Sequence, residues 1–228
     1  ESNSTLDLMP QRLVNPKPVA VIGAGPAGLS CATELAARGF DVHLYEAAAE
    51  IGGQFNLAKR VPGKEEYAET LRYFGKMIEK TGVQLHLNSR VSAAELLENG
   101  FREVVLATGV SPRVPAIAGI EHPKVLSYVD VLLGKKTVGK KVAIIGAGGI
   151  GFDVAVYLTA PLTNVDAVAA YQQEWGIDPA YQHRGGITTL EPEPSPRAVW
   201  LLQRSKGKVG AGLGKTTGWA HRLTLKHR

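Results

Sequence analysis

The sequence predicts an α/β fold made of two related domains, and two observations carry this prediction. A glycine-rich stretch follows an apolar run twice, as VAVIGAGPAGL over residues 19–29 and as VAIIGAGGIGF over residues 142–152. The two copies start 123 residues apart, which is the size of a small domain and far too long for a solenoid repeat. After the first copy, apolar runs of strand length alternate with segments of helical periodicity. The pattern is typical of Rossmann-like dinucleotide-binding domains.

The expected elements of the first domain follow one another as strands and helices of ordinary length. The helix that opens at the glycines carries apolar residues on one face and ends at Gly39, and a later helix ends at Gly82. In order we expect a strand over 19–22, a helix over 27–38, a strand over 41–45, a helix over 65–80, a half-buried strand over 83–87 and a strand over 104–107.

The second domain starts near Lys140 and has fewer recognisable elements. We expect a strand over 142–145, a helix over 149–158 and a strand over 198–202, after which only a glycine-rich basic segment remains, so this domain is incomplete. The expected organisation is a polar leader (1–18), part of a first dinucleotide-binding domain (19–109), a proline-containing crossover (110–139), and an incomplete second dinucleotide-binding domain (140–228) with an inserted excursion (159–197).

Composition limits the chemistry that the chain can perform by itself. With 44% hydrophobic and 21% charged residues, the 228-residue chain is an ordinary globular one. A single cysteine, Cys31, excludes an internal disulfide and the paired cysteines of a dithiol reductase, so redox chemistry must come from a cofactor. The six histidines show no metal-ligand spacing, and we expect no metal. Without a membrane-length apolar run or a signal peptide, a cytoplasmic protein without a membrane partner is expected.

The net charge of +5 is concentrated at the end of the chain, where residues 204–228 contain no acidic residue. Such a basic tract indicates a phosphate-bearing partner. Nucleic acid is the less favoured alternative, because no aromatic platform or recognised nucleic-acid motif accompanies the tract. A triphosphatase P-loop at Lys215 and Thr216 is disfavoured because its first glycine is replaced by Val209 and no strand leads into it.

The first glycine motif has the context of a dinucleotide site. Gly23 permits the tight turn, Gly25 lets the backbone approach a pyrophosphate, and Gly28 lets the helix pack close to the strand. The pyrophosphate would lie at the helix N-terminus, where free N–H groups stabilise its charge. Glu46 follows the next strand and suits a ribose 2′-hydroxyl, so the site favours FAD or NAD over NADP. The alternative is a tight turn with a solvated Glu46.

The second glycine motif, Gly146-x-Gly148-x-x-Gly151, differs from the first in the side chains that follow its next strand, which are basic and not acidic. Its second strand ends at Gln203-Arg204, with further lysines close behind, and an arginine can pair with a 2′-phosphate through a charge-assisted fork. This favours NADPH over NADH. The spacing from the glycines is far longer than the usual ~20 residues, so the inference requires the excursion to loop out. The alternative is that these basic residues are solvated loop charges.

Two further segments favour FAD over NAD for the first site. EIGGQFN over 50–56 and the Ala-Thr-Gly turn at 107–109 resemble segments of two-dinucleotide-domain flavoproteins such as glutathione reductase and thioredoxin reductase, where both run close to the flavin cofactor. We expect no catalytic side chain, because hydride transfer needs none as acid or base. The candidate cofactor-binding residues are Gly23, Gly25, Pro26, Ala27, Gly28, Glu46, Gly52, Gly53, Gln54, Val91, Thr108, Gly109, Gly146, Gly148, Gly149, Ile150, Gly151, Arg204 and Lys206.

Longer strings resemble one family within this group, the NADPH-dependent 2,4-dienoyl-CoA reductases of the bacterial flavin and iron–sulfur type. They are IGGQFNLAK (51–59), VPGKEE (61–66), TLRY (70–73), HPKVLSY (122–128), GGIGFD (148–153), EWGID (174–178) and GLGKTTGW (212–219). The resemblance implies hydride transfer from NADPH to FAD, then electron transfer through a 4Fe–4S cluster to FMN in a barrel where an unsaturated fatty acyl-CoA is reduced. The excursion is also similar to this family.

The resemblance also implies that this chain is only part of such an enzyme. The barrel, the cluster cysteines and the Gly-Asp segment that completes the FAD site in the family are not in the sequence, so the chain is not expected to be active alone in the family reaction. A related flavin oxidoreductase with another substrate, for example an amine dehydrogenase or an electron-input subunit of an amidotransferase, and a non-catalytic nucleotide-binding remnant remain alternatives.

Overall fold

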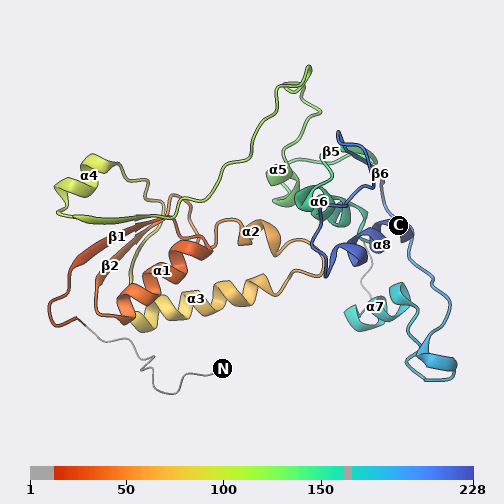
Figure 1. Ribbon diagram of the computed structural model, residues 1–228, viewed down its shortest axis with the longest axis horizontal. Coiled ribbons are helices and arrows are strands. Elements are labelled where there is room, and N and C mark those ends of the chain that lie inside the picture. The colour runs from red at the N-terminus through yellow and green to blue at the C-terminus, as the bar shows by residue number, and fades with distance from the viewer. Residues whose placement is uncertain (1–12, 162–165) are drawn as a thin grey trace. The chain divides into compact units, whose positions relative to one another are not determined.

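The computed structural model describes residues 13–161 and 166–228 of the chain, coloured by residue number in Figure 1. The chain divides into two compact units. Unit 1 runs to Lys59 and resumes over Gly63–Ile120, and unit 2 comprises Arg60–Pro62 and Glu121–Arg228. Most of the expected leader, residues 1–12, lies outside the described residues.

Unit 1 is built on a four-stranded parallel sheet with the strand order β3-β2-β1-β4. The strands are β1 (Pro18–Ile22), β2 (Asp41–Tyr45), β3 (Gln84–His86) and β4 (Glu103–Leu106). Because the chain crosses from β3 back to the far side of β1, the carboxyl ends of β1 and β4 form a topological switch point, where open α/β sheets bind their ligands. The predicted α/β, Rossmann-like fold is confirmed.

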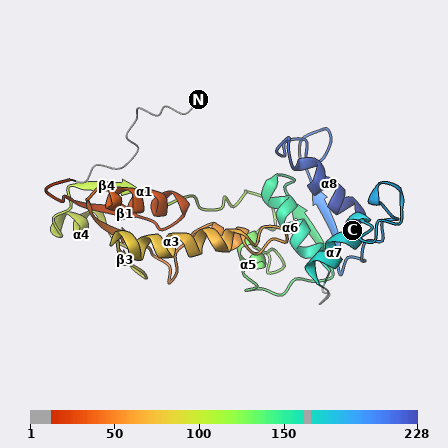
Figure 2. The same cartoon turned by 90° about the horizontal axis from the view of Figure 1, so that it is seen from below.

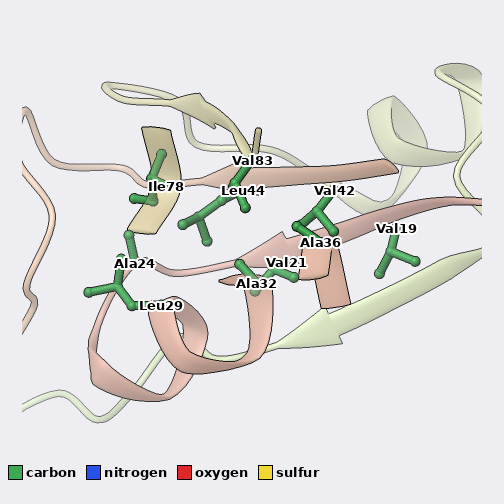
Figure 3. Close-up of a cluster of buried hydrophobic side chains, with 10 residues drawn as sticks. All are labelled: Val19, Val21, Ala24, Leu29, Ala32, Ala36, Val42, Leu44, Ile78 and Val83. Atoms are coloured by element: carbon green, nitrogen blue, oxygen red, sulfur yellow. The ribbon is translucent and has the colours of Figure 1, made fainter. Parts of the chain in front are cut away.

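Helices α1 (Pro26–Ala37) and α3 (Tyr67–Thr81) pack side by side against one face of this sheet, as Figure 2 shows. Alternate residues of each strand point to this face because side chains alternate along a strand. Val21 and Leu44 meet Leu29 of α1 there, and all three are fully buried. Figure 3 shows the ten buried side chains of this core, drawn from both helices, the strands and the turns beside them.

The opposite face of the sheet is covered in part by α4 (Ala93–Glu98), a helix that the sequence analysis did not predict. Its start is fixed by a capping box in which the Ser92 hydroxyl accepts from Glu95 N–H while the Glu95 carboxylate accepts from Ser92 N–H. Leu96 packs from this helix against Ala20 and Phe101. A six-residue helix shows too little periodicity to be recognised without its cap.

Two histidines stack on this second face of the sheet. His43 on β2 and His86 on β3 have ring centroids 5.2 Å apart, with 3.0 Å between His43 Nδ1 and His86 Nε2. Tyr45 stacks on His86, and Phe101 meets His43 edge-on. Burial, and secondarily the neighbouring His43, lowers the pKa of His86. These contacts give His43 a structural role in unit 1.

We expect the stability of unit 1 to fall as the pH drops below about 6.5, the ordinary histidine pKa. In the unfolded chain His86 takes up a proton near this pH, whereas the folded protein resists protonation, so acid favours unfolding. His86→Phe keeps an aromatic ring in the stack and removes this titration. Thermal midpoints between pH 8 and pH 5 should therefore decline less in the variant, and an identical decline in both proteins would contradict the assignment.

Unit 2 contains a two-stranded parallel sheet of β5 (Lys141–Ile145) and β6 (Ala198–Leu202). Helix α6 (Gly149–Thr159) contacts both strands and buries Phe152, Ala155 and Leu158. Helices α5 (Tyr128–Leu132) and α8 (Gly218–His227) both pack against α6. Because β5 and β6 pair directly, the long segment between α6 and β6 lies outside the paired strands.

The basic end of the chain is not merely the glycine-rich segment that the sequence analysis expected, because it folds into α8. Arg222 donates from Nη1 to Gly210 O at 3.0 Å, and the Gly210 α-carbon lies against the Phe152 ring, which fixes this segment on α6. Arg228 pairs with Glu174 at 2.9 Å. Part of the basic charge therefore serves internal packing, which only tertiary contacts reveal.

The described part of the excursion also contains regular structure, namely α7 (Ala167–Trp175) and a closed loop after it. Asp178 organises this loop: its buried carboxylate accepts hydrogen bonds from the main-chain N–H groups of Ala180, Gln182 and His183. The His183 imidazole lies 2.8 Å from the same carboxylate and, as the largest cause, lowers the pKa of Asp178 to about 2. Among the described helices, none is long and apolar enough to span a membrane.

Candidate functional site

The glycine turn after β1 leaves an open helix N-terminus at the switch point of unit 1. Gly23 adopts φ 104°, a conformation that favours glycine, and Gly25 is the N-cap of α1. Pro26 occupies the first helical position, where its missing N–H costs nothing. The first helical bond runs from Leu29 N–H to Gly25 O, and no side chain in the described residues caps the helix. The free N–H groups of the first turn, among them that of Ala27, can therefore bind an anion.

Gly28 allows the close approach of the helix to the turn. A Cβ built on Gly28 would overlap the carbonyl oxygen of Gly23 and would lie 3.3 Å from Ala107 Cβ. In contrast, a Cβ built on Gly25 meets no protein atom within 4 Å. Packing therefore requires glycine at position 28, whereas the open space beside Gly25 is available to a ligand.

Glu46 at the carboxyl end of β2 lies directly beside this turn. Its Oε2 accepts a hydrogen bond from Ala24 N–H at 2.8 Å, and its Oε1 accepts from Ala48 N–H at 2.8 Å. Each carboxylate oxygen has two lone pairs, so both can accept a further bond. The carboxylate is thus fixed next to the glycine turn and can accept from ribose hydroxyl groups.

The Gly52-Gly53 pair contacts the same turn. Gly52 N–H donates to Ala24 O at 2.8 Å, and a Cβ on Gly53 would lie 3.1 Å from Gly25 Cα. Both glycines have positive φ angles, 122° and 51°. Gln54, the N-cap of the short helix α2 (Phe55–Ala58), is exposed beside them.

The Ala-Thr-Gly turn after β4 also reaches Gly23. A Cβ on Gly23 would lie 2.5 Å from Ala107 O and 3.1 Å from Thr108 Cα, so these segments touch through main-chain atoms. Thr108 and Gly109 are exposed at this edge. The structure therefore brings together four separate candidate segments at the carboxyl ends of β1, β2 and β4.

Val91 is partly buried and packs against the Leu96 and Phe101 cluster under α4. The segment that leads to it is fixed to β2, because Ser89 N–H donates to Glu46 O at 2.8 Å.

The arrangement in unit 1 fits a dinucleotide by its donor and acceptor groups. Free N–H groups and the positive end of α1 suit a pyrophosphate, and the Glu46 carboxylate suits the adenosine ribose. Gly25 and Gly53 present no side chain where a large ligand must approach the backbone. The residues present therefore fit a bound dinucleotide without rearrangement of the turn.

Unit 2 repeats the first turn in its local geometry. Gly146 has φ 114° and its N–H donates to Leu202 O at 3.0 Å, while Gly148 is the N-cap of α6. A Cβ on Gly151 would overlap Gly146 O, and a Cβ on Gly148 would meet no atom within 4 Å. Gly149 and Ile150 form the exposed first turn of α6.

The loop after β6 carries basic rather than acidic side chains. The bond from Gly146 to Leu202 places the start of this loop beside the second glycine turn. Gln203 Nε2 donates to Ser205 O and Gly207 O, which folds the loop on itself, and Arg204 and Lys206 are exposed. Exposed cations beside a helix N-terminus suit a ligand that carries more than one phosphate.

Unit 2 also contains a cavity of about 560 Å³. It is lined by Phe152, Thr159, Arg197, Trp200, Arg222 and Arg228 and by neighbouring residues of β6 and α8. Its lining includes β6 from Ala198 to Leu201, and Leu201 also lies beside the second glycine motif, because a Cβ on Gly151 would lie 3.4 Å from Leu201 Cδ1. The cavity therefore borders the motif, although the glycines themselves do not line it.

The sequence analysis missed Asn56 and the Asp178–His183 pair. Asn56 and Asp178 lie within strings that carried the family resemblance and His183 lies outside them, but no motif gave any of these side chains a role. Among the described residues, no group of three or more histidine, cysteine, aspartate or glutamate side chains is placed to hold a metal ion.

Comparison with known proteins relates most of the chain to reductases and an oxidase. Over 215 residues it is 34% identical to the metal reductase of Desulforamulus reducens, covering 92% of this chain and 31% of that protein. It is 34% identical to the NADH oxidase of Thermoanaerobacter brockii, covering 87% of this chain and 29% of that protein. The solved complex of 2-naphthoyl-CoA reductase with 2-naphthoyl-CoA matches with a TM-score of 0.74 and 28% identity, over 95% of this chain and 28% of that one.

The chain spans less than a third of the length of each of these three relatives. The model of the family described as pyridine nucleotide-disulphide oxidoreductase matches residues 17–174, which include both glycine turns and most of the chain. The chain belongs to the pyridine nucleotide-disulphide oxidoreductase family, whose fold binds FAD and NAD(P).

Proposed function

We propose that this chain is the module that passes hydride from NADPH to FAD in a flavoprotein reductase. The observation that carries the proposal is the pair of similar glycine turns with opposite charge at the ribose end, Glu46 in unit 1 and Arg204 in unit 2. A hydride relay needs two dinucleotides that the protein distinguishes, and opposite charges at these positions provide the distinction.

In unit 1 the proposed roles follow from the contacts at the switch point. The first turn of α1 and the main chain of Gly25 and Gly53 bind the pyrophosphate, and Glu46 accepts from the adenosine ribose. The Glu46 charge repels a 2′-phosphate, which favours FAD over NADP. FAD, when bound, supplies the acceptor for two electrons and a proton as hydride.

In unit 2 the first turn of α6 binds the pyrophosphate of NADPH, and Arg204 and Lys206 bind its 2′-phosphate. The inference rests on charge and on the hydrogen bond between Gly146 and Leu202, which sets the loop beside the turn. The chain's own residues bind, orient and discriminate, and no side chain needs to act as acid or base.

The substrate of the proposed enzyme is an unsaturated acyl-CoA, as in a 2,4-dienoyl-CoA reductase of fatty acid β-oxidation in the cytoplasm. Two points support this class: the strings that resemble that family, and the similarity over 95% of the chain to a structure of a reductase bound to a CoA ester. FMN and a 4Fe–4S cluster belong to this proposal only as groups held by other parts of a longer protein.

The test is an absorbance spectrum of the purified chain with added FAD, followed by anaerobic NADPH. We expect bound-flavin bands that bleach on addition of NADPH. Flavin that is bound but not bleached would contradict the hydride relay, and a chain that never retains FAD would contradict cofactor binding by this module.

A second candidate is the same module with NADH as donor and another electron acceptor. It is favoured by the 34% identity to a protein named NADH oxidase and to one named metal reductase. Bleaching with NADH and NADPH in parallel separates the two, because the basic loop of unit 2 should make NADPH effective at the lower concentration.

A further inference from the structure

We propose that Asn56 is a positioning residue of the unit 1 cofactor site, acting through Ile51 and Gly52 on the turn that binds the pyrophosphate. The inference rests on the proposed function, since it concerns the same site. Its independent support is the surroundings of the Asn56 amide, whose Nδ2 is hydrogen-bonded whereas its buried Oδ1 has no partner among the described residues.

The Asn56 amide is fixed beneath the Gly52-Gly53 pair. Its Nδ2 donates to Ile51 O at 2.9 Å, and a Cβ on Gly52 would lie 2.9 Å from both Nδ2 and Oδ1 of Asn56. Gly52 N–H in turn donates to Ala24 O in the glycine turn. A continuous path of contacts therefore leads from the Asn56 amide to the backbone that faces the pyrophosphate.

The Oδ1 atom of the same amide lowers the stability of unit 1. This atom is buried and has no hydrogen-bond partner in the described part of the protein. A buried acceptor without a partner destabilises the fold, and a leucine of similar length would remove that acceptor. A buried polar atom without a partner calls for an explanation, and the other contacts of this amide lead to the glycine turn.

The hydrogen bond from Asn56 Nδ2 fixes the backbone of the segment next to the glycine turn. Ile51 and Gly52 belong to an irregular segment, and Gly52 has φ 122°, so its backbone is not fixed by a helix or strand. The amide holds the Ile51 carbonyl and packs against the Gly52 α-carbon, which keeps Gly53 against Gly25 before a ligand arrives. Fixing the segment in advance reduces the conformational entropy lost on binding.

The experiment compares the unaltered chain with Asn56→Leu and Asn56→Ala, and uses Asn99→Leu as the control. Asn99 also donates its amide to a main-chain carbonyl, that of Glu95 at 2.8 Å, but it lies at the end of α4 and is exposed. The measurements are FAD affinity by flavin fluorescence, the thermal midpoint without FAD, and hydrogen exchange of the Gly52 amide.

We expect both Asn56 variants to bind FAD roughly tenfold more weakly and to exchange the Gly52 amide faster. The thermal midpoint of Asn56→Leu without FAD should change little, because losing the bond to Ile51 O offsets removing the unpartnered Oδ1, and Asn99→Leu should retain FAD affinity. Unchanged FAD affinity in both Asn56 variants would overturn the proposal, as would a weakening accompanied by an equal loss of stability in Asn56→Leu.

Failure of the proposed function gives a different result. If the unaltered chain binds no FAD, the proposed function fails, and the Gly52 amide decides the positioning role by itself. Faster exchange in both Asn56 variants would support that role, and unchanged exchange would overturn it.

Discussion

Gly25→Ala is expected to weaken FAD binding by roughly a hundredfold, equivalent to the loss of a charge-assisted hydrogen bond of about 1.5–3 kcal/mol. The backbone at Gly25 has φ −75° and ψ −179°, which alanine adopts without strain, and its added Cβ meets no protein atom within 4 Å. The methyl group therefore projects into the space where the pyrophosphate must approach. Fluorescence titration with FAD, together with a thermal melt of the FAD-free protein, measures both consequences.

Gly28→Ala is the matched comparison in the same turn. Its Cβ would overlap Gly23 O, so the helix must move away from the strand, and we expect a loss of about 1–3 kcal/mol in the free energy of unfolding. Gly25→Ala should leave this free energy nearly unchanged. If the two substitutions destabilised the protein equally, the assignment of Gly25 to ligand approach would be wrong.

Arg204→Ala is expected to weaken NADPH binding by about ten- to a hundredfold while NADH binding changes little. The physical reason is the loss of a charge-assisted contact to the 2′-phosphate, which NADH lacks. Isothermal titration of both nucleotides gives the ratio directly. Arg184→Ala removes an exposed arginine from the loop after α7 and controls for the general loss of positive charge in unit 2. An equal weakening of both nucleotides in Arg204→Ala would remove the basis for choosing NADPH.

The local character of the two turns could be read from the residues alone. Glycines spaced as at 23, 25 and 28, between an apolar run and a helical segment, are typical of the strand-to-helix turn of a dinucleotide site, and their chemistry follows from the missing side chains. The regular strands and α1, α3 and α6 were also predicted within a few residues of their observed bounds, because their apolar periodicity is strong. The short or weakly periodic helices α4, α7 and α8 were not, since their ends depend on caps and on packing.

What the sequence by itself determined was the α/β fold, the two glycine turns and the opposite charges that follow them. Only the tertiary structure decided that Gly53 lies against Gly25 and that Ala107 lies against Gly23. These contacts join segments distant in sequence through main-chain atoms, and main-chain atoms are the same for every residue type. Their meeting follows from the order in which the strands pair, so it becomes visible only when the sheet is assembled.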